Sequence, residues 1–176
     1  MVASDAPLVR VGRDRFDLHL EPEERRILAS LVGELRAELD DPQASRPDGA
    51  LARLYPPAFP DDPEAEASYA DLVHADLVDI RRQRVALVAA TIEAGALDDL
   101  QATAWLGVLN DTRLVLGANL GVTGDGDDRP PRPGEPDGMR RTVFAYLGWL
   151  VGSFTDALAE GLPEVRDEAS GAPEAS

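Results

Sequence analysis

Apolar and polar residues alternate near the N-terminus of the chain. The apolar positions of this alternation are Val9, Val11, Phe16, Leu18 and Leu20. Gly12-Arg13-Asp14 interrupts the pattern, and glycine and aspartate are frequent turn residues. Alternation with a period of two on both sides of a turn signal predicts two strands that bury one face. We therefore expect a β-hairpin over residues 8–20.

After residue 20 the apolar spacing changes to three and four, which is the period of an amphipathic helix. The first helix is predicted to begin at Glu21-Pro22-Glu23-Glu24, because an early proline and acidic residues suit a helix N-terminus. Asp40-Asp41-Pro42 ends it. Its predicted buried stripe is Ile27, Leu28, Leu31, Val32, Leu35 and Leu39.

A second and longer helix follows residues 42–63, a stretch that contains six prolines. Within that stretch, residues 51–59 predict a short helical turn followed by apolar side chains that anchor it. Asp62-Pro63 combines a capping carboxylate with a proline at the first helical position, so it predicts the start of the long helix, and Gly95 stops it. The predicted buried stripe is Tyr69, Leu72, Val73, Leu77, Ile80, Leu87, Val88, Thr91 and Ile92.

Two further helices complete the pattern. The third is capped by Asp98 or Asp99 and closed by Gly121, and the last runs from about Asp137 to Glu160. The predicted core positions of the third helix are Leu100, Trp105, Leu106, Leu109, Leu116 and Leu120. Those of the last helix are Val143, Phe144, Leu147, Leu150, Val151, Phe154 and Leu158.

These elements predict a mainly α fold: a four-helix-type α domain with an N-terminal β-hairpin laid against it. A single domain over residues 8–160 suits a chain of 176 residues. We expect residues 1–7 to be disordered, the glycine- and proline-rich segment 121–138 to be a mobile loop, and residues 161–176 to be a disordered acidic tail. Two of the helices are long enough to leave apolar surface for a second copy, which allows a homodimer.

The composition removes several classes of chemistry. All 17 cationic side chains are arginine, against 33 acidic ones, so the formal net charge is −16. Without lysine the chain has no Walker-type phosphate lysine and no Schiff-base chemistry. Without cysteine it has no thiolate nucleophile, no disulfide and no cysteine-ligated zinc.

The acidic excess is spread along the chain. Residues 124–138 and 163–176 each carry a net charge of −3, so −10 remains on the rest. A body this acidic disfavours direct nucleic-acid binding and favours a basic protein partner. Neither a signal sequence nor a stretch of about 18 uninterrupted apolar residues is visible, so we expect a cytoplasmic protein without a membrane span.

Asn110, Asp111 and Arg113 interrupt an otherwise apolar helix. Residues three apart share one face of a helix, so Asn110 and Arg113 can bond to a neighbouring helix. Two interpretations remain open. The cluster is either structural and fixes which helices pack together, or it presents an arginine that recognises a partner carboxylate.

Arg81, Arg82 and Arg84 form the densest positive spot. They follow residues 61–79, which hold seven acidic residues and no basic one, and Asp79 can pair with Arg82 across one turn. The spot is either a charge-paired, solvated face or a binding surface for an acidic partner or a phosphate. The neighbouring pair Arg140 and Arg141, near the start of the last helix, would extend this partner-binding surface if the fold brings the two spots together.

No pattern in the sequence indicates an enzyme, a metal site or a cofactor. Asp71-x-x-His74 has the spacing of helical di-iron sites, but such sites need the motif twice and it occurs once. Residues 125–128 offer oxygen ligands for calcium but lack the bidentate glutamate of a helix–loop–helix site. No nucleophile elbow, phosphate-binding loop or serine–histidine–acid pattern is present. We therefore predict a non-enzymatic protein with no cofactor.

Three stretches of the chain form a familiar set: FDLHLEPEERRILASLV at 16–32, LARLYPPAFPDDPEAEASY at 51–69 and WLGVLNDTRLVLGANLGV at 105–122. They resemble a family of actinobacterial proteins known as a domain of unknown function, which includes the actinomycete oxidative-stress regulators. The resemblance spans about Val9 to Leu158, and its most specific part is the segment 105–122.

The resemblance implies regulation of transcription in redox stress, in which the protein associates with a stress-response sigma factor and promotes sulfur-amino-acid synthesis. Some members sense oxidants through a closely spaced cysteine pair. This chain has no cysteine, so sensing by a disulfide does not carry over, and oxidation of Met1 or Met139 is a weak substitute. Our leading hypothesis is a cytoplasmic regulator that acts by protein–protein contact. A direct DNA-binding regulator and a structural or adaptor module are the alternatives.

Overall fold

The computed structural model describes residues 6–41, 51–122 and 137–160. Its elements, in chain order, are β1 (Leu8–Arg10), β2 (Arg15–Leu18), α1 (Pro22–Asp40), η1 (Ala52–Leu54), α2 (Pro63–Thr91), β3 (Ala96–Asp98), α3 (Asp99–Asn119) and α4 (Gly138–Ala159). The prediction of a mainly helical fold with an N-terminal hairpin is confirmed. The predicted disordered ends and mobile loop, 1–7, 121–138 and 161–176, fall almost wholly outside the described residues.

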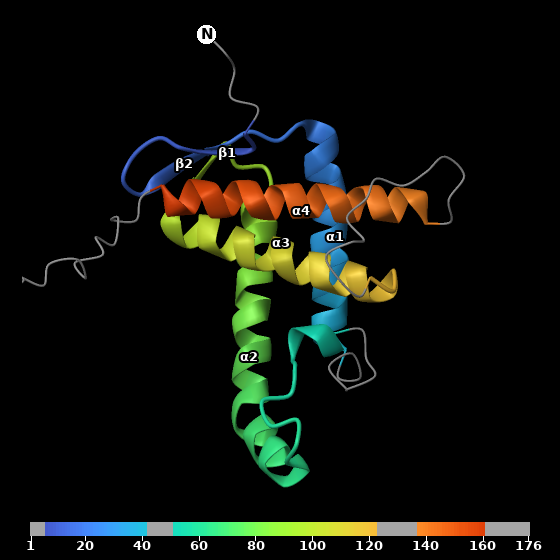
Figure 1. Cartoon of the computed structure of the whole chain (residues 1–176). Helices are drawn as coiled ribbons and strands as arrows, with labels where there is room; N and C mark the ends of the chain where they lie inside the picture. The colour runs from blue at the N-terminus through green and yellow to red at the C-terminus, as the bar shows by residue number, and fades with distance from the viewer. Residues whose placement is uncertain (1–5, 42–50, 123–136, 161–176) are drawn as a thin grey trace, which may run out of the picture.

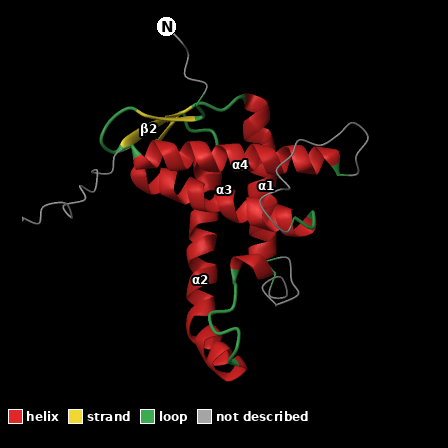
Figure 2. Ribbon diagram, in the orientation of Figure 1, coloured by secondary structure: helices red, strands yellow, loops and turns green. Residues whose placement is uncertain are grey.

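A third strand extends the predicted hairpin into a small antiparallel sheet. β1 pairs with β2, placing Val9 opposite Asp17, and β2 pairs with β3, placing Phe16 opposite Leu97. Figure 2 shows the sheet at one end of the helical body, above the last turns of α4. The three residues of β3 are too few to show a period of two, so the apolar pattern does not reveal this strand.

The helix starts follow the predicted capping signals. The side chain of Asp62 accepts a hydrogen bond of 3.0 Å from the N–H of Ala65, with Pro63 in the first turn of α2. At the start of α3 the side chain of Asp98 accepts a 2.7 Å bond from the N–H of Gln101. In both places the side chain satisfies a backbone donor that the helix leaves unpaired, which fixes where the helix begins.

One hydrophobic core joins the sheet to the helices. α3 and α4 lie side by side (Figure 1), and the rings of Trp105 and Phe154 stack between them with centroids 5.9 Å apart. The indole N–H of Trp105 donates to the hydroxyl of Thr91 at 2.8 Å, which ties α2 to the same core. Phe16 of β2 is fully buried beneath the sheet. The stacked pair is therefore at the centre of the fold.

Three parts of the predicted core are wrong. In the hairpin, Val11 is 50% exposed, because the register places Leu8, and not Val9 or Val11, on the buried face with Leu18.

Four of the first five positions of the α2 stripe are exposed: Tyr69, Leu72, Leu77 and Ile80. Val88, a predicted position, is buried, but α2 also buries Val78 and Val85, which the predicted stripe omits. Because each residue turns a helix by about 100°, Val78 lies on a different side from Leu77. The first half of α2 projects beyond α3 and α4 (Figure 1), so no neighbouring helix covers the predicted stripe there. Leu100, in the first turn of α3, is also exposed.

Within the described ranges, one helix, α4, is long and apolar enough by length and composition alone to cross a membrane. Core helices of globular domains pass the same test, so it is weak evidence. On its inner face α4 buries Phe144, Leu147, Leu150 and Phe154. Packing into the core accounts for those apolar residues.

Candidate functional site

The arginine spot of α2 and the polar cluster of α3 meet in one ion pair. Nε of Arg81 donates to Oδ2 of Asp111 at 3.1 Å, and Nη2 donates to the carbonyl of Leu54 at 3.0 Å. The guanidinium carbon also lies 4.7 Å from the centre of the Tyr55 ring. The side chains of Arg81 and Asp111 are only 19% and 12% exposed. A single arginine therefore joins α2, α3 and the segment that contains η1.

Burial shifts the titration of the groups around this ion pair. Burial raises the pKa of the Asp111 carboxyl above its ordinary value, and the positive charge of Arg81 opposes that shift. Burial also raises the pKa of the Tyr55 hydroxyl, again against the effect of Arg81. Asp111 and its counter-ion Arg81 are enclosed between α3 and α2. The pair therefore has the position of a structural contact that holds these two helices together.

The other two arginines of the α2 spot also contact neighbouring helices. Arg82 donates from Nη2 to the carbonyl of Leu39 at 2.8 Å and from Nε to Oδ1 of Asp40 at 3.2 Å, both at the end of α1. Its Nη1 lies 3.3 Å from Oδ1 of Asp79, so the pairing predicted across one turn is confirmed. Arg84 is exposed and lies over Gly107 of α3.

The residues of the α3 cluster point in different directions. Arg113 packs against α4, where its guanidinium carbon lies 4.5 Å from the centre of the Phe144 ring and its Nε lies over Gly148. Asn110, three residues earlier, is exposed. The cluster therefore contacts α2 through Asp111 and α4 through Arg113, which fits the structural interpretation of fixing helix pairing.

Arg140 and Arg141 lie at the start of α4. Arg140 is exposed and lines a small hollow of about 60 Å³ together with Glu34 and Asn119. Arg141 is half-buried. Because Arg81 lies between α2 and α3 while Arg140 lies beside the ends of α1 and α3, the described residues do not join the two spots into one surface.

Arginines from other elements cover the ends of the helices. None of the four α-helices has a basic residue in its own last turn. Arg82 reaches the last carbonyls of α1, Arg25 those after α2, Arg10 those of α4, and Arg53 the carbonyl of Val122 just after α3. A helix C-terminus carries unpaired carbonyls and a partial negative charge, so a guanidinium with five donors stabilises it.

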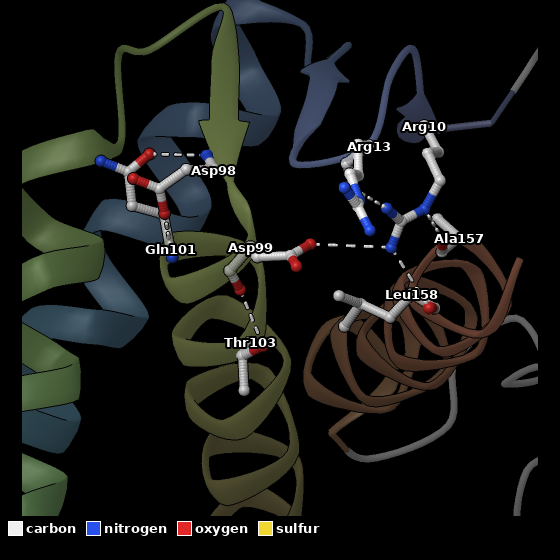
Figure 3. Close-up of polar contacts among 8 residues, drawn as sticks. All are labelled: Arg10, Arg13, Asp98, Asp99, Gln101, Thr103, Ala157 and Leu158. Atoms are coloured by element: carbon white, nitrogen blue, oxygen red, sulfur yellow. Dashed lines mark hydrogen bonds and ion pairs between the residues drawn. The ribbon is translucent and has the colours of Figure 1, made fainter. Parts of the chain in front are cut away.

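Figure 3 shows the most extensive of these contacts, that of Arg10 in β1. Its Nε donates to the carbonyl of Ala157 at 3.2 Å and its Nη2 to that of Leu158 at 3.4 Å. Nη2 also lies 3.6 Å from Oδ1 of Asp99, at the start of α3. The guanidinium carbon is 4.4 Å from the centre of the Phe16 ring. Arg10 thus holds the sheet, the end of α4 and the start of α3 together.

A hollow of about 460 Å³ at the start of α1 gathers acidic and aromatic side chains, including Glu21, Glu24, His19 and Trp149. The carboxylate of Glu24 accepts a bond of 2.7 Å from the N–H of Glu21 and one of 2.8 Å from the hydroxyl of Tyr146. Burial, and then the bond to Glu24, raise the pKa of Tyr146 well above its ordinary value. This carboxylate caps α1 and fastens it to α4.

Raising the pH above about 10 is expected to destabilise the fold through Tyr146. Unfolded tyrosine has a pKa of about 10, so it loses its proton before the folded residue does. Above that pH the unfolded state binds fewer protons than the folded state, and the free energy of unfolding therefore falls as the pH rises toward the folded pKa. Urea midpoints measured from about pH 8 to about pH 11.5 should fall less steeply in Tyr146→Phe than in the parent. Equal slopes in the two proteins would contradict this linkage.

A comparison with protein families decides where the chain belongs. The family described as a domain of unknown function, DUF2017, matches residues 6–158. The chain belongs to the DUF2017 family. No curated protein and no solved structure matches it. The Arg10 contacts and the Arg81–Asp111 pair both lie within the DUF2017 domain, so they are part of the family's region of the chain.

Sequence reasoning about this DUF2017 chain missed the arginines that cover helix ends. Arg10 lies in a short strand and Arg53 in a three-residue helix, and nothing in their spacing indicates a distant partner. A signal does exist in the composition. Four helices have no terminal base, and all the cations are arginine, so arginines from other elements are the side chains able to supply positive charge there.

Proposed function

We propose that this DUF2017 protein is a non-enzymatic, cytoplasmic regulator of transcription that acts by contact with another protein, in the first place a stress sigma factor. The observation that carries the proposal is that several arginines bind groups of the protein itself. Arg10, Arg81 and Arg82 bind carbonyls and carboxylates of their own fold. They contribute little to the exposed positive charge of a chain whose net charge is already −16, and an acidic surface suits a basic protein partner.

The resemblance to oxidative-stress regulators supports the transcriptional part of the proposal. Because the chain has no cysteine, regulation in this protein does not use a disulfide of its own. The signal would reach it through the partner or through its own abundance.

Direct DNA binding is a weaker candidate for the same reason. Binding to phosphates needs clustered cations that are free to face the duplex. Arg81 is held between α2 and α3, and Arg82 is bonded to the end of α1. The exposed Arg84 and Arg140 lie on different parts of the fold.

Affinity purification of the tagged full chain from its native cells tests the proposal. We expect a sigma factor or another RNA polymerase component to be recovered, and recovery of none would contradict the transcriptional role. The purified protein should give no mobility shift with duplex DNA at about 50 mM salt. A shift that Arg84→Ala and Arg140→Ala abolish would favour DNA binding instead, and these exposed residues test it without disturbing the internal ion pairs.

A further inference from the structure

One side of α2 remains open in the fold and carries large apolar side chains. Its exposed members, together with one from the preceding segment, are Phe59, Tyr69, Leu72, Leu77 and Ile80. We call residues 59–80 the α2 arm. Figure 1 shows the arm projecting beyond α3 and α4, with the segment that precedes α2 at its side. A set of large apolar side chains gathered on one element marks an interaction site.

The exposed side chains form a continuous strip along the arm. Tyr69, Leu72, Leu77 and Ile80 follow the helical period, so they lie on one side of α2. The ring of Phe59 meets that of Tyr69 edge-on with centroids 5.8 Å apart, which extends the strip beyond the helix. From Tyr69 to Ile80 the helix rises about 16 Å, or three turns. A partner helix of about the same length would cover the strip.

The arm is a fixed part of the fold. The N–H of Phe59 donates to Oε2 of Glu66 at 2.8 Å. The ring of Tyr55 packs on His74 with centroids 4.7 Å apart. The strip is therefore presented by a helix that is already formed, so a partner would not have to order it on binding.

Negative charge lies within the strip and at its edge. Residues 61–79 contain seven acidic residues and no basic one. Asp76 is exposed and lies one turn from both Leu72 and Ile80. Asp79 follows on the same half of the helix, and its partner Arg82 stands at the end of the arm nearest the helical body. Asp76 thus lies within the strip, between Leu72 and Ile80, and Asp79 lies at its edge, so the exposed side of the arm combines large apolar side chains with carboxylates.

None of the segments outside the described residues is cationic, so none of them complements the charge of this strip. A second copy docked by two-fold symmetry would place the same acidic strip opposite the first, and like charges would face each other. The segments outside the described residues have net side-chain charges of −1 (1–5), 0 (42–50), −2 (123–136) and −3 (161–176). Charge complementarity therefore favours an occupant from another protein over a second copy or these segments.

We propose that the α2 arm binds a cationic amphipathic helix of a partner protein. The apolar side of that helix lies on the strip, and its arginines or lysines lie against Asp76 and Asp79. This inference rests on the proposed function, because it names the surface through which a regulator acting by contact would meet its partner.

Two synthetic helical peptides of about 14 residues test the chemistry of the arm. Both carry leucines at helical spacing, and one has arginines where the other has glutamates. We expect the arginine peptide to bind the full chain at least about tenfold more tightly, measured by fluorescence anisotropy, and added salt to weaken it. Equal binding of the two peptides, or tighter binding of the glutamate peptide, would overturn the proposal.

Leu72→Ser and Leu100→Ser form a matched pair of variants. The two leucines are 77% and 72% exposed on different helices, so neither change should unfold the protein, and thermal midpoints check this. Leu72→Ser should weaken binding of the arginine peptide about fivefold, while Leu100→Ser should leave it within about twofold. If both variants bind as the parent does, the peptide is held elsewhere and the arm is not its site.

Sedimentation of the parent and of Leu72→Ser tests the competing occupant. A dimer that dissociates in Leu72→Ser would show that a second copy covers the strip, which overturns the proposal. The two proposals can also fail separately. If no transcription component is recovered from cells but the arginine peptide binds through Leu72, the transcriptional role fails and the arm's chemistry stands. If the component is recovered and the peptide does not bind, the transcriptional role stands and the proposed chemistry of the arm fails.

Discussion

Replacing Asp111 with alanine is expected to lower the free energy of unfolding by about 3 kcal/mol. The change leaves the guanidinium of Arg81 enclosed between α2 and α3, with the carbonyl of Leu54 as its remaining acceptor among the described residues. Removing one partner of a buried pair costs about 3–5 kcal/mol, and the residual exposure of 19% and 12% places this pair at the lower end. For a domain of this size the midpoint of thermal unfolding should fall by roughly 6–12 °C.

A double variant separates the loss of the pair from the cost of a stranded charge. Arg81→Met with Asp111→Leu removes both charges and fills the space, so it should recover at least about half of the lost stability. Asn110→Ala, at the exposed neighbouring position, is the matched control and should change stability by no more than about 0.5 kcal/mol. Urea and thermal unfolding followed by circular dichroism measure all three. If Asp111→Ala costs no more than Asn110→Ala, the pair does not hold α2 on α3.

Much of this fold can be predicted from local signals because they act within a few residues. Asp62-Pro63 determines the start of α2 through one capping bond, and Asp98 does the same for α3. Gly121 ends α3 in a left-handed conformation, with φ of +67°, which glycine adopts without strain. None of these effects depends on which helix packs on which, so the sequence alone is sufficient to place them.

The side of each helix that is buried depends on its neighbours, and there the sequence was less informative. The apolar spacing of α2 is consistent with two stripes, one through Leu72 and Ile80 and one through Val78 and Val85. Packing on α1 and α3 decides between them, and it buries the second. The other stripe, through Leu72 and Ile80, stays exposed because no neighbouring helix covers it. It is the surface that we propose as a docking site.

The candidate residues were found in the sequence, but their pairing was not. Arg81 and Asp111 both stood out, each within its own cluster, 30 positions apart. Whether they meet depends on how α2 and α3 are rotated about their axes, and a single sequence does not contain that angle. The same limit applies to Arg113, whose position between α3 and α4 follows from the small residue Gly148 opposite it.

The exclusive use of arginine has a physical reason in these contacts. A guanidinium presents several donors in a plane, so one side chain can bind two carbonyls, or a carbonyl and a carboxylate, at the same time. Arg25 binds the carbonyls of Leu20, Ile92 and Ala94 in this way. A lysine has one charged nitrogen and would satisfy fewer acceptors. Arg10, Arg25 and Arg81 are thus used inside the fold, where they contribute little positive charge to the surface.

Replacing Arg10 with methionine is expected to lower the free energy of unfolding by about 2–3 kcal/mol. The change removes the donors to the carbonyls of Ala157 and Leu158, the ion pair with Asp99 and the contact with the Phe16 ring. The last turn of α4 then has carbonyls without a donor and a dipole without a facing cation. Hydrogen exchange should therefore become faster at the end of α4 before it changes in the rest of the core.

Arg15→Met is the matched control, because it makes the same change on the same hairpin. Arg15 is 69% exposed, against 15% for Arg10, and its ion pair with Asp17 is long at 3.6 Å. Its loss should cost no more than about 0.5 kcal/mol. Arg10→Lys keeps the charge but not the planar set of donors, so it should recover less than half of the stability that Arg10→Met loses. If the lysine variant is as stable as the parent, the charge alone holds the end of α4 and the geometry of the guanidinium is not needed.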